Sequence, residues 1–119
     1  MTYLGEVRVL VQGVAKDYDA FVRFMRRSAA EIDENEPGTL LMEIFANSDT
    51  GQALVHERYS DEDAFMAHSA RLMEGANLEE FMQVFDFKRT TFLAGAEDER
   101  VATVAEQFNR DSRLAGCRV

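Results

Sequence analysis

The stretch that decides the fold is QALVHERYSDEDAFMAHSARL at residues 52–72, because a β pattern changes into a helical pattern within it. Residues 52–59 are rich in β-forming side chains and predict a strand. Ser60 and Asp63 have the spacing of a capping box, which predicts that a helix begins at about Asp61. One face of that helix carries Ala64, Phe65, His68 and Leu72.

A second strand and a turn come directly before this stretch. Residues 39–46 are again β-rich, and residues 47–51 are a cluster of turn formers. Two strands joined by such a turn predict a β-hairpin, in which residues 39–46 pair with residues 52–59.

The N-terminal third is predicted to be a strand followed by a helix. Residues 3–12 alternate, with three valines on one face, as in a half-buried strand. Asp17 can cap the following helix, which ends at Glu36-Pro37-Gly38 because proline lacks a backbone donor and glycine reverses the chain. The stripe of this helix consists of Phe21, Phe24, Met25, Ser28 and Ile32.

The C-terminal part is predicted to add a strand and one more helix. Gly75 interrupts the second helix, and Asn77 is placed to cap a short continuation. Residues 84–93 alternate and predict a fourth strand. Residues 97–109 have apolar residues at helical spacing and are followed by a polar tail.

The order β-α-β-β-α-β, followed by a terminal helix, is that of the ferredoxin-like α+β fold with a four-stranded antiparallel sheet. We expect residues 1–95 to form this domain and residues 96–119 to form a C-terminal helical extension and tail. Apolar residues occur on both faces of the predicted strands, for example at Val9 and Leu10. Since two helices cover only one face of such a sheet, we expect a homodimer in which two sheets pack together.

The composition of the 119 residues excludes several function classes. Thirteen Lys and Arg against 22 Asp and Glu give a net charge of −9 at pH 7, which would repel a nucleic-acid backbone. The longest apolar run, at residues 64–67, is far shorter than the roughly 20 residues of a membrane span. The first residues lack a signal-peptide pattern, and the single cysteine, Cys117, permits no internal disulfide. Both observations predict a cytoplasmic protein.

Two stretches carry a resemblance to a known family. Residues 36–40 place Glu-Pro-Gly before the second predicted strand, and the run from Glu57 to His68 leads from the third strand into the second helix. Together they resemble the antibiotic biosynthesis monooxygenase family, which repeats an acidic residue, proline and glycine, then a glutamate, an aromatic residue and a histidine in these places. The resemblance covers about residues 3–95 and implies a dimeric α+β barrel.

The resemblance also implies an activity, because many members oxidise phenolic or quinol-like substrates with O₂ and without a metal or flavin. We therefore expect a cofactor-independent monooxygenase that acts on a small hydrophobic phenolic, quinol or polyketide-like substrate, with no cofactor and no metal. Tyr59 stands where relatives commonly have tryptophan, and the chain has no tryptophan, which disfavours the haem degradation of some relatives. The alternative is a non-catalytic dimeric module of the same fold that binds a small molecule or another partner.

His68 is the first candidate for a catalytic base. It lies on the apolar face of its helix, one turn after Phe65 and one turn before Leu72. Burial there would lower the pKa of His68 and keep the imidazole neutral and able to accept a proton. A structural histidine that is hydrogen-bonded to a strand would show the same pattern, so both interpretations stay open.

Three residues of the third strand complete the predicted catalytic set. Glu57 would orient His68, while Tyr59 and Arg58 would donate hydrogen bonds to the oxyanion that forms on the substrate. Each residue has a structural alternative. Glu57 would anchor the helix start, Tyr59 would belong to the core, and Arg58 would join His56 and Arg89 in a polar cluster or in cross-strand pairs with glutamates such as Glu43.

Overall fold

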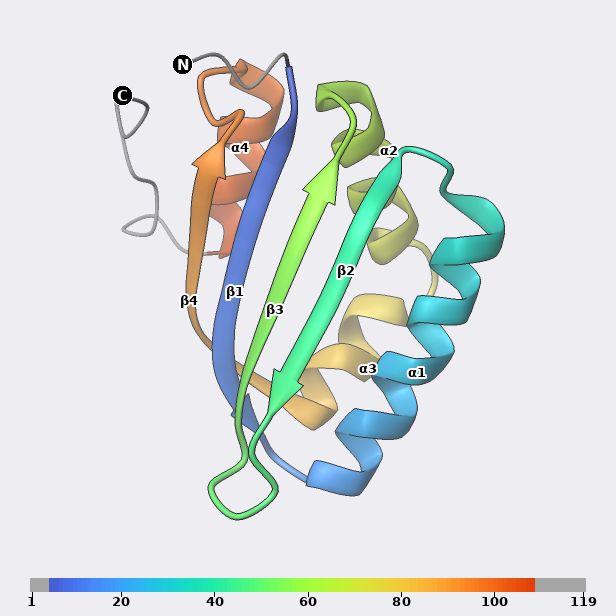
Figure 1. Ribbon diagram of the computed structural model, residues 1–119, viewed down its shortest axis with the longest axis vertical. Helices are drawn as coiled ribbons and strands as arrows, with labels where there is room; N and C mark the ends of the chain where they lie inside the picture. Colours follow the sequence, from blue (N-terminus) through green and yellow to red (C-terminus); the bar gives the residue numbers. More distant parts are fainter. Residues whose placement is uncertain (1–4, 109–119) are drawn as a thin grey trace.

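The computed structural model, which describes residues 5–108, has a four-stranded antiparallel sheet with helices on one face (Figure 1). The strands are β1 (Val7–Ala15), β2 (Thr39–Ala46), β3 (Gln52–Tyr59) and β4 (Phe85–Ala94), and they lie in the order β2-β3-β1-β4. The helices are α1 (Tyr18–Asn35), α2 (Glu62–Met73), α3 (Asn77–Val84) and α4 (Glu99–Phe108). The predicted ferredoxin-like α+β fold is therefore confirmed.

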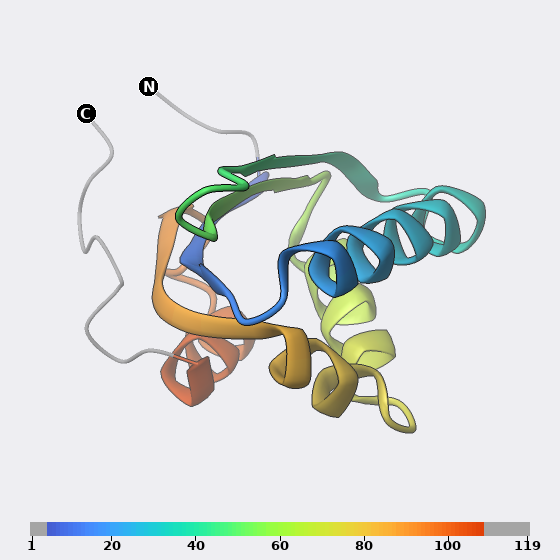
Figure 2. The same ribbon diagram turned by 90° about the horizontal axis from the view of Figure 1, so that it is seen from below.

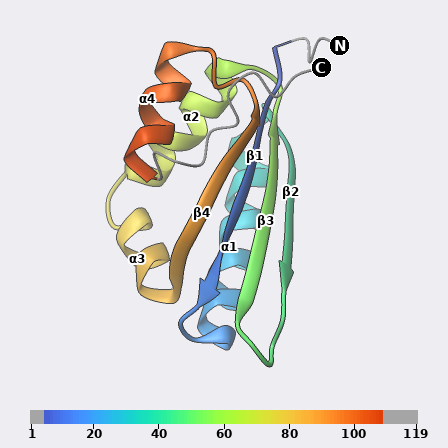
Figure 3. The same cartoon turned by 90° about the vertical axis from the view of Figure 1, so that its left-hand side faces the viewer.

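The helices lie on one side of the sheet. Figure 3 shows α2, α3 and α4 there, and Figure 2 shows α1 on the same side, next to α2 and α3. The opposite face, which we call the outer face, carries no helix within residues 5–108. The face that the helices cover is called the inner face. The strand register places Glu57 there between apolar neighbours, because Glu57 pairs with Val9 and Met42, and Val9 pairs with Phe92.

The hydrophobic core lies between the inner face and the helices. Phe21 of α1 stacks on Phe85 of β4 with ring centroids 5.2 Å apart, which ties the start of α1 to the sheet. The largest fully buried side chains are Tyr59, Phe21, Phe85, Val7, Val55 and Val101.

Strand β1 begins and ends later in the chain than the strand predicted at residues 3–12. It begins at Val7 and continues to Ala15, whereas residues 1–4 are outside the described part of the chain. Gly13 allows the strand to continue past Gln12, because a Cβ at Gly13 would lie only 2.2 Å from the backbone oxygen of Asp86 in β4. The close approach of β1 and β4 thus requires a glycine in the middle of a strand.

Two of the predicted helix caps were wrong. At α2 the cap is Asp61 instead of Ser60, since an Oδ1 atom of Asp61 accepts a hydrogen bond from the Ala64 N–H at 2.7 Å. At α3, Asn77 makes no cap, and its side-chain amide donates to the backbone oxygen of Arg71 at 2.9 Å. The cap predicted for α1 is confirmed, because Asp17 accepts from a backbone N–H in the first turn.

The last helix packs into the same core as the rest of the fold. Helix α4 contacts α2 and β4, and its Val101 and Ala105 are fully buried. It begins at Glu99, two residues after the predicted start, and the polar tail with Cys117 lies outside the described residues. None of the helices between residues 5 and 108 combines the length and the apolar character that a bilayer crossing needs.

Candidate functional site

A cavity of about 130 Å³ lies between the inner face of the sheet and helices α1, α2 and α3. Its lining is mainly apolar and includes valines of the central strands and methionines of α1 and β2. Aromatic rings form much of the wall, namely Phe24, Phe65, Phe81, Phe87 and Phe92. The polar side chains that reach this cavity are therefore the candidates for chemistry.

Glu36 holds the polar groups of the cavity together. It follows the last residue of α1, where its backbone N–H still bonds to the Ile32 oxygen at 2.8 Å. One carboxylate oxygen, Oε1, lies 2.8 Å from His68 Nδ1 and accepts from the Thr39 hydroxyl at 2.9 Å. The other, Oε2, accepts from Arg71 Nε at 3.0 Å. Only 6% of the Glu36 side chain is exposed, so these partners replace water around its charge.

Helix α2 brings His68 and Arg71 to the same carboxylate. The two residues are three positions apart, a spacing that places them on one side of a helix. Because the carboxylate of Glu36 only accepts hydrogen bonds, His68 Nδ1 carries the proton of this bond. In the neutral imidazole the lone pair is then on Nε2, and His68 lines the cavity.

The expected lowering of the His68 pKa was wrong. Burial does act in that direction, but the hydrogen bond to Glu36 and the negative charge of Glu57 outweigh it and raise the pKa of His68 above its ordinary value. Burial alone would raise the pKa of Glu36. The hydrogen bond from His68 outweighs this effect, and the pKa of Glu36 is lowered. Each partner therefore favours the charged form of the other.

Glu57 lines the cavity, but it does not orient His68 through a hydrogen bond as predicted. Its Oε1 accepts a hydrogen bond from the hydroxyl of Tyr59, two residues further along β3. Burial raises the pKa of Glu57, although the charge of His68 and the bond from Tyr59 act in the opposite direction. Glu57 is thus a carboxylate with increased proton affinity inside an apolar cavity.

Tyr59 is a core residue rather than a donor at the cavity surface. Its side chain is fully buried, and its ring packs edge-on against Phe65 with centroids 5.3 Å apart. The centroid of the His68 ring also lies 5.3 Å from the centroid of the Tyr59 ring. Because Tyr59 donates its hydroxyl hydrogen to Glu57, it can act on the cavity through that carboxylate and not by direct contact.

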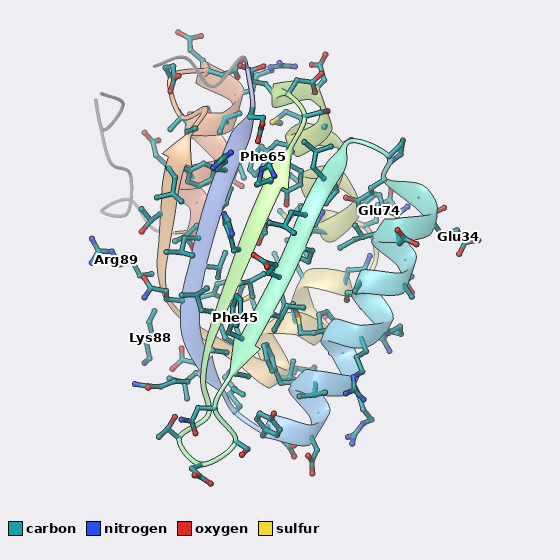
Figure 4. The ribbon with its side chains drawn as sticks, in the orientation of Figure 1. Glu34, Phe45, Phe65, Glu74, Lys88 and Arg89 are labelled. Atoms are coloured by element: carbon teal, nitrogen blue, oxygen red, sulfur yellow. The ribbon has the colours of Figure 1, made fainter. Side chains whose placement is uncertain are left out.

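Arg58 was predicted to stabilise an oxyanion, but the structure does not place it in the cavity lining. Successive side chains of a strand point to opposite faces, so Arg58 lies on the outer face. There its Nε and Nη2 bind both carboxylate oxygens of Glu6 at 2.9 and 3.0 Å. His56, on the same face, pairs with Glu43 as the simpler alternative predicted. Arg89 points away from the sheet at the edge of β4 (Figure 4).

Sequence reasoning missed Glu36 and Arg71. The signal for Glu36 was present in the Glu-Pro-Gly turn, which was interpreted as a helix end and as part of the family resemblance, but not as a source of a site residue. The signal for Arg71 was its position three residues after His68. Among the described residues, no group of three or more His, Cys, Asp and Glu side chains is arranged to hold a metal ion.

Comparison with known proteins places this site in a family. The family model described as antibiotic biosynthesis monooxygenase matches residues 13–73, slightly more than half of the chain, and these residues include Glu36, Glu57, His68 and Arg71. No match was found among curated proteins.

Two solved structures have the same fold. MupZ from Pseudomonas fluorescens is 18% identical with a TM-score of 0.65, over 87% of this chain and 84% of its own. SnoaB, a cofactor-independent oxygenase from Streptomyces nogalater, is 16% identical with a TM-score of 0.60, over 76% of this chain and 92% of its own. With the match of the family model, these likenesses lead to one conclusion: the chain belongs to the antibiotic biosynthesis monooxygenase family.

Proposed function

We propose that this protein is a cofactor-independent monooxygenase that oxidises a small hydrophobic phenolic or quinol-like substrate with O₂. The observation that carries the proposal is the bond between His68 Nδ1 and the buried carboxylate of Glu36 at 2.8 Å, beside an apolar cavity. This bond fixes the ring and leaves Nε2 as the basic atom. The name of SnoaB, a cofactor-independent oxygenase of the same fold, is consistent with this chemistry.

The first step is removal of a phenolic or enolic proton. His68 Nε2 takes this proton, and the imidazolium that forms is stabilised by the carboxylates of Glu36 and Glu57, which also raise the pKa of His68. The raised pKa makes His68 a stronger base than a free imidazole. The substrate anion and the imidazolium are then opposite charges in a site of low dielectric constant, where their attraction is stronger than in water.

The second step is the reaction of the substrate anion with O₂. The electron-rich carbon gives electrons to O₂ and forms a C–O bond, which yields a peroxide on that carbon. The O–O bond then breaks, one oxygen stays on the carbon as a carbonyl group, and the other leaves as water with the two hydrogens that the substrate has lost. The substrate supplies all four electrons, so the reaction needs no other reductant.

We also propose that the protein works as a homodimer in which two outer faces pack together. Phe45 of β2 is 57% exposed, and in the register it neighbours Leu54 of β3 on the outer face. Leu10 of β1 lies on the same face, between His56 and Thr91. Exposed apolar side chains across a sheet face favour burial against a second copy.

The alternative is a non-catalytic dimeric module that binds a small molecule. One observation favours it: neither of the two predicted hydrogen-bond donors lines the cavity. Tyr59 is buried in the core, and Arg58 lies on the outer face. In that case the cavity would bind its ligand without turnover, and Glu36 and His68 would only stabilise the fold.

Oxygen consumption distinguishes the two functions. Metal-stripped protein is mixed with a panel of hydroquinones, anthrones and catechols, and the wild type is compared with His68→Gln. The matched control is His56→Gln, which changes the outer-face histidine that pairs with Glu43. We expect uptake that is lost in His68→Gln and kept in His56→Gln. Uptake above the protein-free rate that is equal in all three proteins would contradict His68 as the base. No uptake above the protein-free rate with any compound would favour the binding module.

A further inference from the structure

The cavity has a polar side that the proposed base does not explain. Arg71 lines the cavity with His68, but 35% of its side chain is exposed against 15% for His68. Arg71 therefore lies where the cavity meets solvent. A cation in this place is suited to hold a substrate rather than to take part in the oxidation.

Glu36 fixes the orientation of the Arg71 guanidinium. Arg71 Nε donates to Oε2 of this carboxylate at 3.0 Å, while His68 uses Oε1. Within residues 5–108 this is the only hydrogen bond of the Arg71 side chain, so its two Nη groups are free to bind a ligand. Paired guanidinium N–H groups match the two oxygens of a carboxylate.

The other charged groups of the lining already have partners or face solvent. Arg27 donates to Glu80 at 2.7 Å, so its charge is balanced. Glu36 is paired with His68 and Arg71, and Glu57 accepts from Tyr59. Glu31, the remaining acid of the lining, is exposed. Arg71 is consequently the cation of the lining that is best placed for an anionic ligand group.

The size and the walls of the cavity favour one aromatic ring. Its volume of about 130 Å³ is similar to that of an engineered apolar cavity of about 150 Å³ that binds benzene. Phe65 and Phe92 meet edge to face with centroids 5.5 Å apart, and Phe81 and Phe87 do so at 5.0 Å. Such walls favour a flat ring, and the volume fits a single aromatic ring.

We propose that the ligand of this cavity is a single-ring phenol that carries a carboxylate. The ring lies among the phenylalanines, the hydroxyl group faces His68, and the carboxylate binds Arg71. The role of the hydroxyl rests on the proposed oxygenase function, whereas the carboxylate site does not. His68 and Arg71 both bind the carboxylate of Glu36, so the ligand's hydroxyl and carboxylate are proposed to lie on the same side of the ring.

Calorimetric binding to 2- and 3-hydroxybenzoate and to their uncharged amides tests this proposal. The titrations are done without O₂, so that binding is measured apart from turnover. We expect at least one acid to bind tenfold or more tightly than its amide, because a charged hydrogen-bonding pair is formed. Arg71→Gln should remove this preference without changing the affinity for the amide, and Arg71→Lys should keep part of it. The control is Arg26→Gln, an equal charge change on an exposed residue of α1 outside the lining.

The outcomes separate this proposal from the oxygenase function. Equal binding of acid and amide, a preference that survives Arg71→Gln, a parallel loss of both affinities, or no binding of any of the four compounds would overturn the carboxylate site. A preference that depends on Arg71, together with no oxygen consumption from any panel compound, would leave the carboxylate site standing and overturn the oxygenase. Oxygen consumption that depends on His68 without a preference for acids would do the reverse.

Discussion

Glu36 is the residue on which the arrangement of the site depends. Its carboxylate joins Thr39 of β2 to His68 and Arg71 of α2, directly after the end of α1. A carboxylate this deeply buried is tolerated only with such partners, and removing it leaves the two cationic groups without a counter-charge. One residue therefore controls both the proton affinity of the base and the position of the proposed carboxylate ligand.

The first prediction concerns Glu36→Gln. Loss of the carboxylate removes the strongest interaction that raises the pKa of His68, so this pKa should fall, as measured by NMR titration of the imidazole. The variant should also lose about 3 kcal/mol of unfolding free energy at neutral pH, because buried charge pairs are broken. Since the Glu36 pKa is lowered in the folded protein, the difference should shrink as the pH falls through that pKa.

Glu34→Gln is the matched control, because Glu34 lies on α1 and points away from the body of the protein (Figure 4). Neither the His68 pKa nor the stability should change measurably in this variant. A His68 pKa that is the same in Glu36→Gln and wild type would contradict the assigned hydrogen bond.

The second prediction concerns Glu57→Gln. The pKa of Glu57 is raised in the folded protein, so its ionisation opposes folding, and wild-type stability should fall as the pH rises through the raised pKa. Glutamine can still accept the hydrogen bond from Tyr59, and we expect the variant to be about 1 kcal/mol more stable at pH 8 by urea denaturation. Glu74→Gln, at an exposed position, should have no effect. Lower stability of Glu57→Gln at pH 8 would show that the charge of Glu57 stabilises the fold.

The sequence allowed part of the site to be predicted at this scale. His68 and Glu57 were found because they stand on predictable elements, and both line the cavity. The direction of the His68 pKa shift could not be predicted, since it depends on Glu36, which is 32 residues away in the chain. Arg58 was given a catalytic role although strand alternation places its side chain on the face opposite Glu57.

At the scale of elements, the position of α2 decides where His68 and Arg71 lie. The loop before β2 supports this helix, because the Gly38 oxygen accepts from the Ser60 N–H at 2.8 Å. A Cβ added at Gly38 would lie 2.5 Å from the Cβ of Ala64, in the first turn of α2. The glycine of the Glu-Pro-Gly turn therefore gives α2 room to approach.

The third prediction follows from this contact. Gly38→Ala should cost about 1–3 kcal/mol of unfolding free energy, because the new methyl group pushes against α2. Ala64→Gly should cost about 1 kcal/mol through helix propensity. The double variant should lose less unfolding free energy than the two single losses added together, because glycine at position 64 removes the methyl group that the new one meets. Thermal and urea unfolding of the wild type, the two single variants and the double variant measure this coupling. Strict additivity would contradict the close contact.

The order of the strands and helices was predictable, but some local details were not. Apolar periodicity and turn residues are properties of the sequence itself, so each element was found within a few residues of its place. The register shift in β2 between Thr39 and Leu41 was not visible, because it depends on pairing with β3. It leaves Leu40 half exposed, whereas strict alternation along β2 would place Leu40 on the same face as Met42.

At the scale of the whole molecule, the two faces of the sheet have different roles. The inner face and the helices enclose the cavity, while the outer face has polar pairs between exposed apolar residues. Figure 4 shows Phe45 on the side of the sheet that faces away from the helices. This division supports a dimer that leaves the cavity of each copy intact.

The fourth prediction tests that dimer. The wild type should sediment with twice the 13.5 kDa mass of one chain, and Phe45→Glu should shift it to the single-chain mass, because a buried charge opposes the packing of two outer faces. Met82→Glu is the control, since Met82 is similarly exposed but belongs to α3. A wild type of single-chain mass, or a dimer that dissociates only in Met82→Glu, would contradict a dimer through the outer face.

The most direct test of the central claim is the pH dependence of oxygen consumption in wild type and Glu36→Gln. If His68 is the base, the wild-type rate should rise with pH through the raised pKa of His68, where the imidazole becomes neutral. Glu36→Gln should shift this rise to lower pH and reduce the maximal rate, because its His68 is a weaker base. A rise at the same pH in both proteins, or a rate independent of pH, would contradict a base formed by His68 and Glu36.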